Sequence, residues 1–193
     1  MPKPARFCNR CRFCLMKPPM SASPDDLFAY FDSLNIPHRT AWHAPVFTVA
    51  QGRALRGEDA QGHTKNLFVR DKKGTPFLVT ALEDTAIELK SLHRRLGASG
   101  RFSFGSAELM RELLGVEAGS VTPFAVLNDK DRRVSVVLDA AMMTHEVLHF
   151  HPLTNTGTTT IARADLVKFL TVTGHPPRIE VLTGAAPNGL ASP

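Results

Sequence analysis

The chain has 193 residues, the length of a single domain, and its 43% hydrophobic and 21% charged residues are typical of a soluble globular protein. Its net charge of +5 suits a polyanionic partner such as tRNA or DNA. No apolar run is long enough to span a membrane, and the N-terminus lacks the apolar segment of a secretory signal. We therefore expect a cytoplasmic protein without a membrane partner.

The three cysteines, Cys8, Cys11 and Cys14, all lie near the N-terminus. Their C-x-x-C-x-x-C spacing is that of a metal site, but zinc normally takes four ligands and no fourth lies nearby. Prolines flank the cysteines and no apolar periodicity surrounds them, which favours a disordered leader over residues 1–20. Zinc binding by the three cysteines is the alternative.

The folded domain is expected to be one unit over residues 21–174. Ser23 is an N-cap and Pro24 fits a first helical position, so an amphipathic helix is predicted from there to about Leu34. A strand follows at 38–43. A capping box that begins at Thr48 predicts a short helix through Leu55.

Two strands joined by a tight turn come next, at 65–70 and 76–82, with Asp71-Lys72-Lys73-Gly74 as the turn. Lys65 and Asn66 open the first of these strands, where a strand edge can present both a cation and an amide to a ligand. From this stretch alone, an ordinary solvated edge lysine is the favoured interpretation.

The second half continues the mixture of helices and strands. In chain order, the predicted elements are a helix at 85–96, a strand at 101–104, a helix at 107–114, a hairpin of strands at 124–127 and 134–138, a strand at 145–151, a Thr-rich strand edge or cap at 155–161, and a helix at 165–172. Residues 175–193 are rich in Pro and Gly and are expected to be a loose tail. This order favours an α+β fold, with a mixed or antiparallel sheet covered by helices, over a doubly wound parallel sheet.

Three histidines, His145, His149 and His151, are separated by even numbers of residues, so on one strand they would share a face. Three imidazoles on one face can bind zinc. No carboxylate or cysteine stands at a telling position beside them, so we expect no metal. His151 is of most interest, because it ends the predicted strand just before Pro152.

Four stretches of the chain match a known pattern in the right order. They are Ala44–Val49 (A-P-V-F-T-V), Lys65–Gly74 (K-N-L-F-V-R-D-K-K-G), Gly119–Pro123 (G-S-V-T-P) and Phe150–Asn155 (F-H-P-L-T-N). In these stretches the chain resembles the YbaK/ProX family of trans-editing aminoacyl-tRNA deacylases, which are related to the editing insertion of bacterial prolyl-tRNA synthetases. The form of the second stretch resembles the PrdX or ProXp-ala branch more than YbaK itself.

The resemblance implies hydrolysis of the ester that joins a wrong amino acid to the terminal adenosine of tRNA. For this branch, it implies alanine on proline tRNA, with prolyl-tRNA synthetase and elongation factor as further partners. It also implies an α/β (α+β) fold with a mixed, curved, partly barrel-like sheet covered by helices, and a site without metal or cofactor. Water attack assisted by the substrate's own 2′-hydroxyl would explain why the chain lacks a Ser–His or Cys–His pair.

Roles for individual residues follow from the resemblance and from chemistry. Lys65 would supply positive charge to the terminal phosphate or to the developing oxyanion, Asn66 would orient the ester or ribose, and His151 would hydrogen-bond the substrate or the attacking water. The loop of Gly119, Ser120, Val121, Thr122 and Pro123 would hold the aminoacyl end through its backbone. Phe47 and Thr48 would form a wall of the side-chain pocket. The candidate tRNA-phosphate contacts are Arg70, Lys72, Lys73, Arg94 and Arg95.

Two other functions remain open at this point. The same fold can act on tRNA mischarged with cysteine, serine or threonine, since the sequence does not give the size of the pocket. A non-catalytic nucleic-acid-binding module is the second alternative, and the presence of Lys65, Asn66 and His151 argues against it.

Overall fold

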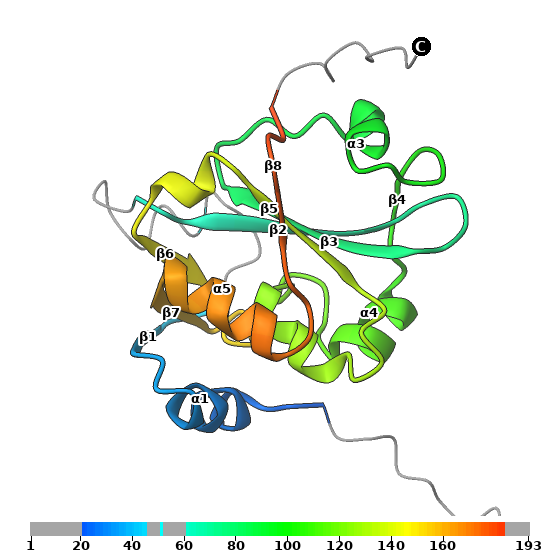
Figure 1. Cartoon of the computed structure of the whole chain (residues 1–193). Helices are drawn as coiled ribbons and strands as arrows, with labels where there is room; N and C mark the ends of the chain where they lie inside the picture. Colours follow the sequence, from blue (N-terminus) through cyan, green and yellow to red (C-terminus); the bar gives the residue numbers. More distant parts are fainter. Residues whose placement is uncertain (1–20, 46–50, 52–60, 184–193) are drawn as a thin grey trace, which may run out of the picture.

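A computed structural model describes residues 21–45, 51 and 61–183, and its strands form two sheets (Figure 1). The five-stranded sheet has the order β4-β2-β3-β5-β8, and its strands are β2 (Thr64–Arg70), β3 (Pro76–Leu82), β4 (Ser103–Phe104), β5 (Ser135–Asp139) and β8 (Arg178–Glu180). The three-stranded sheet has the order β1-β7-β6, and its strands are β1 (His38–Trp42), β6 (Val147–Phe150) and β7 (Gly157–Ala162).

The five-stranded sheet is mixed. β2 pairs antiparallel with β3 along its whole length, while β3, β5 and β8 run parallel to one another. The two sheets meet where His63, just before β2, forms a bridge with His149 of β6. The expected α+β fold with a mixed sheet is therefore confirmed. The expected hairpin of the strands now labelled β2 and β3 is confirmed as well.

Four α-helices and two 3-10 helices belong to the described part of the chain. Their bounds are α1 (Pro24–Ser33), α3 (Leu89–Arg95), α4 (Ala107–Leu114), α5 (Arg163–Val172), η1 (Pro123–Asn128) and η2 (Met142–Thr144). Ser23 caps α1, as the sequence predicts, and forms a capping box with Asp26. Ser106 caps α4 by accepting from the Leu109 N–H through its hydroxyl. Within the described ranges, no helix is long and apolar enough to cross a membrane.

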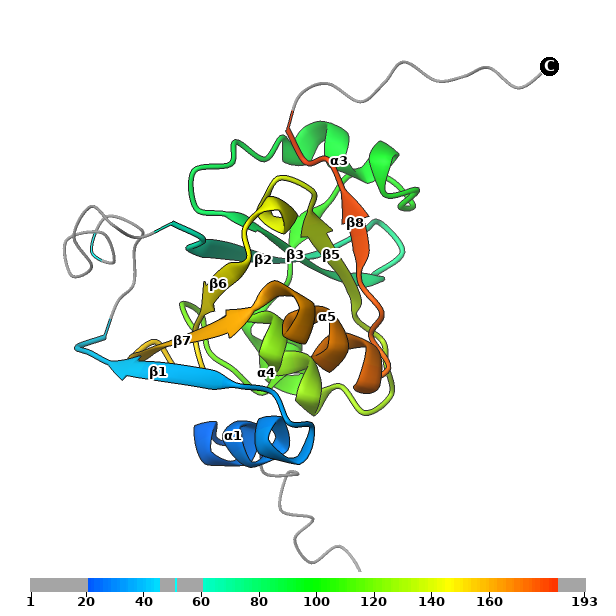
Figure 2. The same cartoon turned by 60° about the vertical axis from the view of Figure 1, so that its left-hand side comes forward.

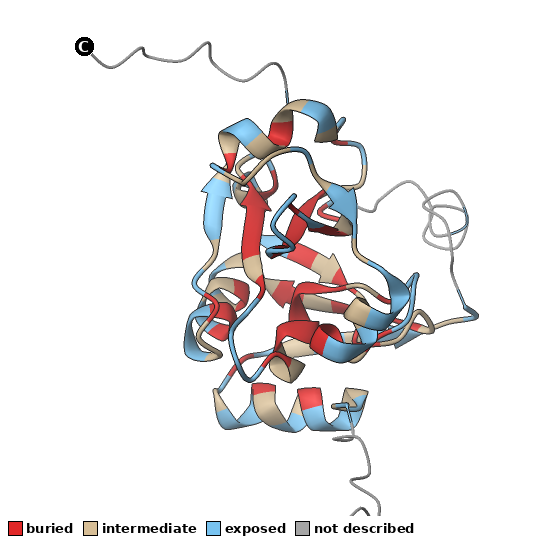
Figure 3. Cartoon of the chain, turned by 90° about the vertical axis from the view of Figure 1, so that its right-hand side faces the viewer, coloured by how far each residue is buried: buried red, intermediate tan, exposed pale blue. Residues whose placement is uncertain are grey.

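Apolar cores lie on both faces of the five-stranded sheet. The larger one packs against α1, α4, α5 and the three-stranded sheet, with Phe31, Phe124 and Phe169 fully buried. The smaller one lies under α3, where Val79 and Leu92 are buried. Figures 1 and 2 show α3 on one side of this sheet and α1 and α4 on the other. Figure 3 shows the buried central strands between these layers.

Burial on both faces explains a sequence feature of β3. Residues 76–81 are all buried, and alternate side chains enter the two cores. A central strand with parallel and antiparallel neighbours is therefore apolar almost throughout and does not alternate.

The predicted hairpin of 124–127 with 134–138 is wrong. Residues 123–128 form η1, and β5 pairs in parallel with β3 and not with its predicted partner. Thr122 caps η1, with its hydroxyl accepting from the Phe124 N–H, and Pro123 fixes a helical φ at the first position. These two residues outweigh the β propensity of the apolar run that follows.

The predicted loose tail after Gly174 is wrong for residues 175–182. β8 extends the sheet beside β5, and both His175 and Leu182 are buried. The His175 ring lies 3.1 Å from a carboxylate oxygen of Asp129, which joins this segment to the turn before β5. The helix predicted at 85–96 is shorter than expected and begins at Leu89.

Some predictions fall on residues outside the described ranges. They are the cysteine leader at 1–20, the capping-box helix from Thr48 to Leu55 apart from residue 51, and the pocket residues Phe47 and Thr48.

Candidate functional site

Lys65 lies at the start of β2, opposite Ala81 of β3. Its ammonium donates a hydrogen bond to the main-chain carbonyl of Thr85, in the loop after β3. Within the part of the chain that the structure describes, this is its one hydrogen bond, so two of its three N–H groups are left for a ligand. The side chain is half-buried, which holds the charge in place without removing it from water.

Asn66 points to the opposite face of the sheet, because neighbouring side chains of a strand alternate. Its side-chain oxygen accepts a 2.8 Å hydrogen bond from the Thr80 hydroxyl of β3. Thr80 is fully buried, so the amide is fixed by the core and its NH2 group is the end that a ligand can use.

Lys65 and Asn66 can contact one ligand only along the edge of β2. On that side, β4 pairs only with Val69 and Arg70. At the other end of β2, the Thr64 hydroxyl donates to the His149 carbonyl at 2.8 Å. The Phe68 carbonyl accepts a further hydrogen bond from the Gly105 N–H at 2.9 Å. Between these contacts, the described residues leave the edge of β2 unpaired at residues 65–67, which is where both side chains can reach one bound group.

The loop from Gly119 to Pro123 leads directly into η1. The Ser120 N–H donates to the Glu117 carbonyl at 3.0 Å, so this group serves the turn and is not free for a substrate. Among the described residues, no acceptor is found for the N–H groups of Gly119 and Val121. Gly119 has a φ of +90°, a conformation that favours glycine.

His151 follows β6, and its Nδ1 lies 2.9 Å from the carbonyl oxygen of Gly157, at the start of β7. A carbonyl oxygen can only accept, so Nδ1 carries the proton of this hydrogen bond, which fixes the ring. The predicted role of His151, to hydrogen-bond a substrate or water, stays a prediction.

Aromatic packing joins the loop to the strand of His151. Phe124, directly after Pro123, packs edge-to-face on Phe150, directly before His151, with ring centroids 5.3 Å apart. Because β6 also contacts β2 through His149, three of the four stretches that carry the family resemblance meet around one core. The fourth, Ala44–Val49, lies mostly outside the described residues.

His145 does not share a strand face with the other two histidines. It ends η2, and β6 begins only at Val147, so this part of the prediction is wrong. His149 stacks on His63, with centroids 4.3 Å apart, and its Nδ1 lies 3.0 Å from the Thr160 hydroxyl. Among the described His, Cys, Asp and Glu side chains, no three are grouped as a metal ion would require.

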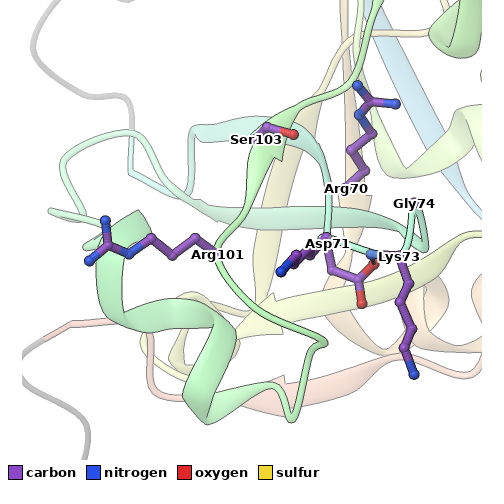
Figure 4. Close-up of a pocket in the computed structure, with 7 residues that line it drawn as sticks. Arg70, Asp71, Lys73, Gly74, Arg101 and Ser103 are labelled. Carbon is purple, nitrogen blue, oxygen red and sulfur yellow. Dashed lines mark hydrogen bonds between the residues drawn. The ribbon is translucent and has the colours of Figure 1, made fainter.

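A basic groove of about 610 Å³ lies at the far end of the β2–β3 hairpin (Figure 4). It brings together Arg70, Lys72 and Lys73, three of the five predicted tRNA contacts. Figure 4 shows Arg70, Lys73 and Arg101 extending outward in different directions around the groove. Arg101, which sequence reasoning missed, joins them because the loop before β4 folds back beside the turn.

Asp71 shapes this groove from inside. Its carboxylate accepts 2.9 Å hydrogen bonds from the backbone N–H groups of Lys73, Thr75 and Ser99. The Ser99 hydrogen bond is the main cause that lowers the pKa of Asp71, with the Thr75 and Lys73 N–H groups adding to it. The same carboxylate therefore closes the turn and ties the loop that carries Arg101 to it.

Arg94 and Arg95 lie in the last turn of α3, away from the lining of this groove. Arg94 is exposed. Arg95 donates to the carbonyl of Val181, so its guanidinium is hydrogen-bonded to the segment directly after β8. The structure thus separates this pair from the other three predicted tRNA contacts.

A model of the aminoacyl-tRNA editing domain family matches residues 43–169. The chain is 38% identical over 156 residues to prolyl-tRNA synthetase associated domain-containing protein 1 of Danio rerio, covering 80% of this chain and 84% of that protein. It is 33% identical over 150 residues to the prolyl-tRNA editing protein ProX of Acetoanaerobium sticklandii, covering 77% of this chain and 91% of that protein.

Among solved structures, one described as a candidate trans-editing enzyme for prolyl tRNA synthetase has the same fold. It superposes with a TM-score of 0.60 and 17% sequence identity, over 77% of this chain and 87% of that one. The family match covers most of the described chain, and these two relatives exceed 30% identity over most of their length. The chain therefore belongs to the aminoacyl-tRNA editing domain family, as the four sequence stretches indicated.

Proposed function

We propose that this protein is a trans-editing hydrolase that deacylates mischarged aminoacyl-tRNA, with alanyl-tRNA(Pro) as its preferred substrate. The observation that carries the proposal is the arrangement of Lys65 and Asn66 on the open edge of β2, in a member of this family. The Danio relative is named for an association with prolyl-tRNA synthetase, and the Acetoanaerobium relative for prolyl-tRNA editing, which supports a proline tRNA.

The proposed chemistry needs no protein nucleophile. An aminoacyl ester is an activated acyl group, so water attacks it once the ester is held in place. The Lys65 ammonium supplies positive charge to the oxyanion or to the terminal phosphate, and the Asn66 NH2 group orients the ester or ribose. His151, whose ring is held by the Gly157 carbonyl, hydrogen-bonds the substrate or the attacking water.

The loop before η1 would bind the aminoacyl end. The N–H groups of Gly119 and Val121 are the donors left for it, since that of Ser120 is used inside the turn. A pocket that admits alanine and excludes proline selects by steric exclusion of the larger side chain, which is more effective than selection against a smaller one.

The protein would act in the cytoplasm on tRNA that prolyl-tRNA synthetase has mischarged, before elongation factor captures it. A protein of Schizosaccharomyces pombe that is named as a candidate proline–tRNA ligase is 28% identical to this chain over 144 residues, which are 20% of its own length. Its name supports a connection between this domain and the synthetase.

A panel of mischarged tRNAs tests the proposal. Alanine, cysteine, serine and threonine esters of tRNA(Pro), with prolyl-tRNA(Pro) as the correctly charged control, are incubated with the full chain and the release of amino acid is timed. We expect alanine to be released fastest and proline to be spared. Faster release of another amino acid would support the deacylase activity but contradict alanine as the preferred substrate. Tight tRNA binding without hydrolysis of any ester would instead identify a non-catalytic binding module.

The basic groove is expected to bind tRNA phosphates. Arg101→Glu should weaken tRNA(Pro) binding by about tenfold and reduce the slope of log Kd against log salt by about 1, because one phosphate contact releases about one counterion. Arg39→Glu is the matched control, since Arg39 is an exposed arginine of β1 in the other sheet. Salt titrations of fluorescent tRNA binding measure both. Equal weakening by the two variants would attribute the effect to net charge and not to the groove.

A further inference from the structure

Lys65 lies at the end of the sheet where three parallel strands finish. β3, β5 and β8 run in the same direction, so their carboxyl ends lie together at this end of the sheet. β2 runs antiparallel to β3 and therefore begins there, with Thr64 paired to Leu82. Residues just after these strand ends are thereby brought next to Lys65, although they are far from it in the sequence.

A chain of hydrogen bonds connects these ends. Lys65 donates to the Thr85 carbonyl, and the Thr85 hydroxyl donates to Oδ2 of Asp139 at 3.2 Å. The other carboxylate oxygen of Asp139, Oδ1, accepts from the Leu182 N–H at 3.2 Å. This chain of hydrogen bonds thus takes one residue from each strand end: Thr85 from the loop after β3, Asp139 from the end of β5, and Leu182 from the segment after β8.

The other two polar groups of Thr85, its N–H and its hydroxyl, each make a hydrogen bond as well. Its N–H donates to the Leu82 carbonyl at 3.0 Å, and its hydroxyl donates to Asp139. The Thr85 carbonyl, which is the acceptor for Lys65, has its direction fixed by these two contacts. Losing the hydroxyl contact would free the peptide that holds the ammonium.

Burying the carboxylate of Asp139 costs free energy. It is 1% exposed, and in the described part of the chain it has no cation within ion-pair distance, only two neutral donors. A buried carboxylate with neutral partners costs free energy that an apolar residue of the same size would not. The packing of the sheet alone does not call for a carboxylate at this place, whereas the hydrogen bond to Thr85 does.

We propose that Asp139 is a positioning residue for Lys65, acting through Thr85, and that the segment after β8 completes this support. The inference rests on the proposed function, because it assigns Lys65 its role in deacylation. It extends the functional unit beyond the family match, which ends at residue 169, to Leu182.

Kinetics of three variants of the full chain test the inference. Thr85→Val keeps the shape of the side chain but loses the hydroxyl, and it should lower kcat about tenfold with KM within twofold of wild type, since the tRNA contacts are elsewhere. Thr85→Ser retains the hydroxyl and should restore kcat to within twofold. Asp139→Asn should also lower kcat, because its amide offers one acceptor oxygen where the carboxylate offers two, to the Thr85 hydroxyl and the Leu182 N–H.

Asp129→Asn is the structural control. Asp129 is also buried, and its carboxylate also accepts from a backbone N–H, that of Val134, but it lies at the other end of β5. This variant should lower the melting temperature without changing kcat at temperatures where it is folded. An equal loss of kcat in Asp129→Asn, or in Thr85→Ser and Thr85→Val alike, would overturn the inference.

A second measurement does not depend on activity. The rate at which an amine-specific acylating reagent labels Lys65, relative to exposed Lys72, is followed by mass spectrometry in each variant. Thr85→Val and Asp139→Asn should raise this ratio threefold or more, while Thr85→Ser and Asp129→Asn should leave it unchanged. If the wild-type chain hydrolyses no ester but the variants show this labelling pattern, the proposed function is refuted, while the positioning of Lys65 by Thr85 and Asp139 is supported. An unchanged ratio in Thr85→Val would refute the positioning.

Discussion

Replacing Lys65 with alanine is expected to lower kcat for deacylation of the preferred mischarged tRNA by about 10²- to 10³-fold, the usual cost of removing one group that stabilises a developing oxyanion. The ammonium makes one hydrogen bond, to a main-chain carbonyl, and the side chain is only half-buried. Its loss should therefore change the free energy of unfolding by no more than about 1 kcal/mol. Single-turnover deacylation and urea unfolding measure the two effects separately.

Lys168→Ala provides a matched control. Lys168 lies on α5 and also donates through its ammonium to a main-chain carbonyl, that of Leu34 at the end of α1, and not to the loop after β3. It should lose a similar amount of stability and none of the activity. Lys65→Arg retains the charge but not its placement, so it should recover only part of the rate. Wild-type turnover by Lys65→Ala would remove Lys65 from the mechanism.

The sequence predicts best those elements whose signals are local. The β2–β3 hairpin follows from two apolar runs around Asp71–Gly74, and α4 follows from Ser106 at one end and Gly115 at the other. Gly115 has the left-handed conformation that ends a helix, with a φ of +64°. In these cases the residues that set the boundary lie directly beside the element in the sequence.

The errors arise where contacts distant in sequence decide. β8 has three residues and no apolar pattern of its own, and it exists as a strand because the edge of β5 offers it partners. Arg178 further anchors it by donating to the Leu96 carbonyl at the end of α3. Neither contact can be read from the composition of the segment, where prolines and a glycine suggest a tail.

The candidate site shows the same division. Lys65, Asn66 and His151 were found through short motifs, whereas Arg101, Thr85 and Asp139 were not. Asp139 carries a weak signal, a carboxylate at the end of the apolar run of β5. Its relation to Lys65 depends on the parallel pairing of β5 with β3, and the sequence had instead suggested a hairpin with residues 124–127. Because the partner of β5 was predicted wrongly, the sequence did not identify Asp139 as a neighbour of Lys65.

The second large effect is expected at Phe124, which links the fold to the site. Its ring is fully buried and packs edge-to-face against Phe31, Phe150 and Phe169, with centroids 5.0, 5.3 and 5.7 Å away. Phe124→Ala should lower the free energy of unfolding by about 3–5 kcal/mol, because it removes these contacts and leaves a cavity. Against a typical total of about 5–15 kcal/mol, this is a large share.

Phe124→Leu is the matched variant, since it keeps an apolar side chain at the centre of the core and should cost less than half as much as alanine. Urea unfolding followed by circular dichroism measures both. Because Phe124 directly follows Pro123 and contacts the residue before His151, the alanine variant should also lose deacylation at urea concentrations where its secondary structure persists. An unfolding free energy within 1 kcal/mol of wild type for Phe124→Ala would mean that this aromatic cluster does not hold the loop against β6.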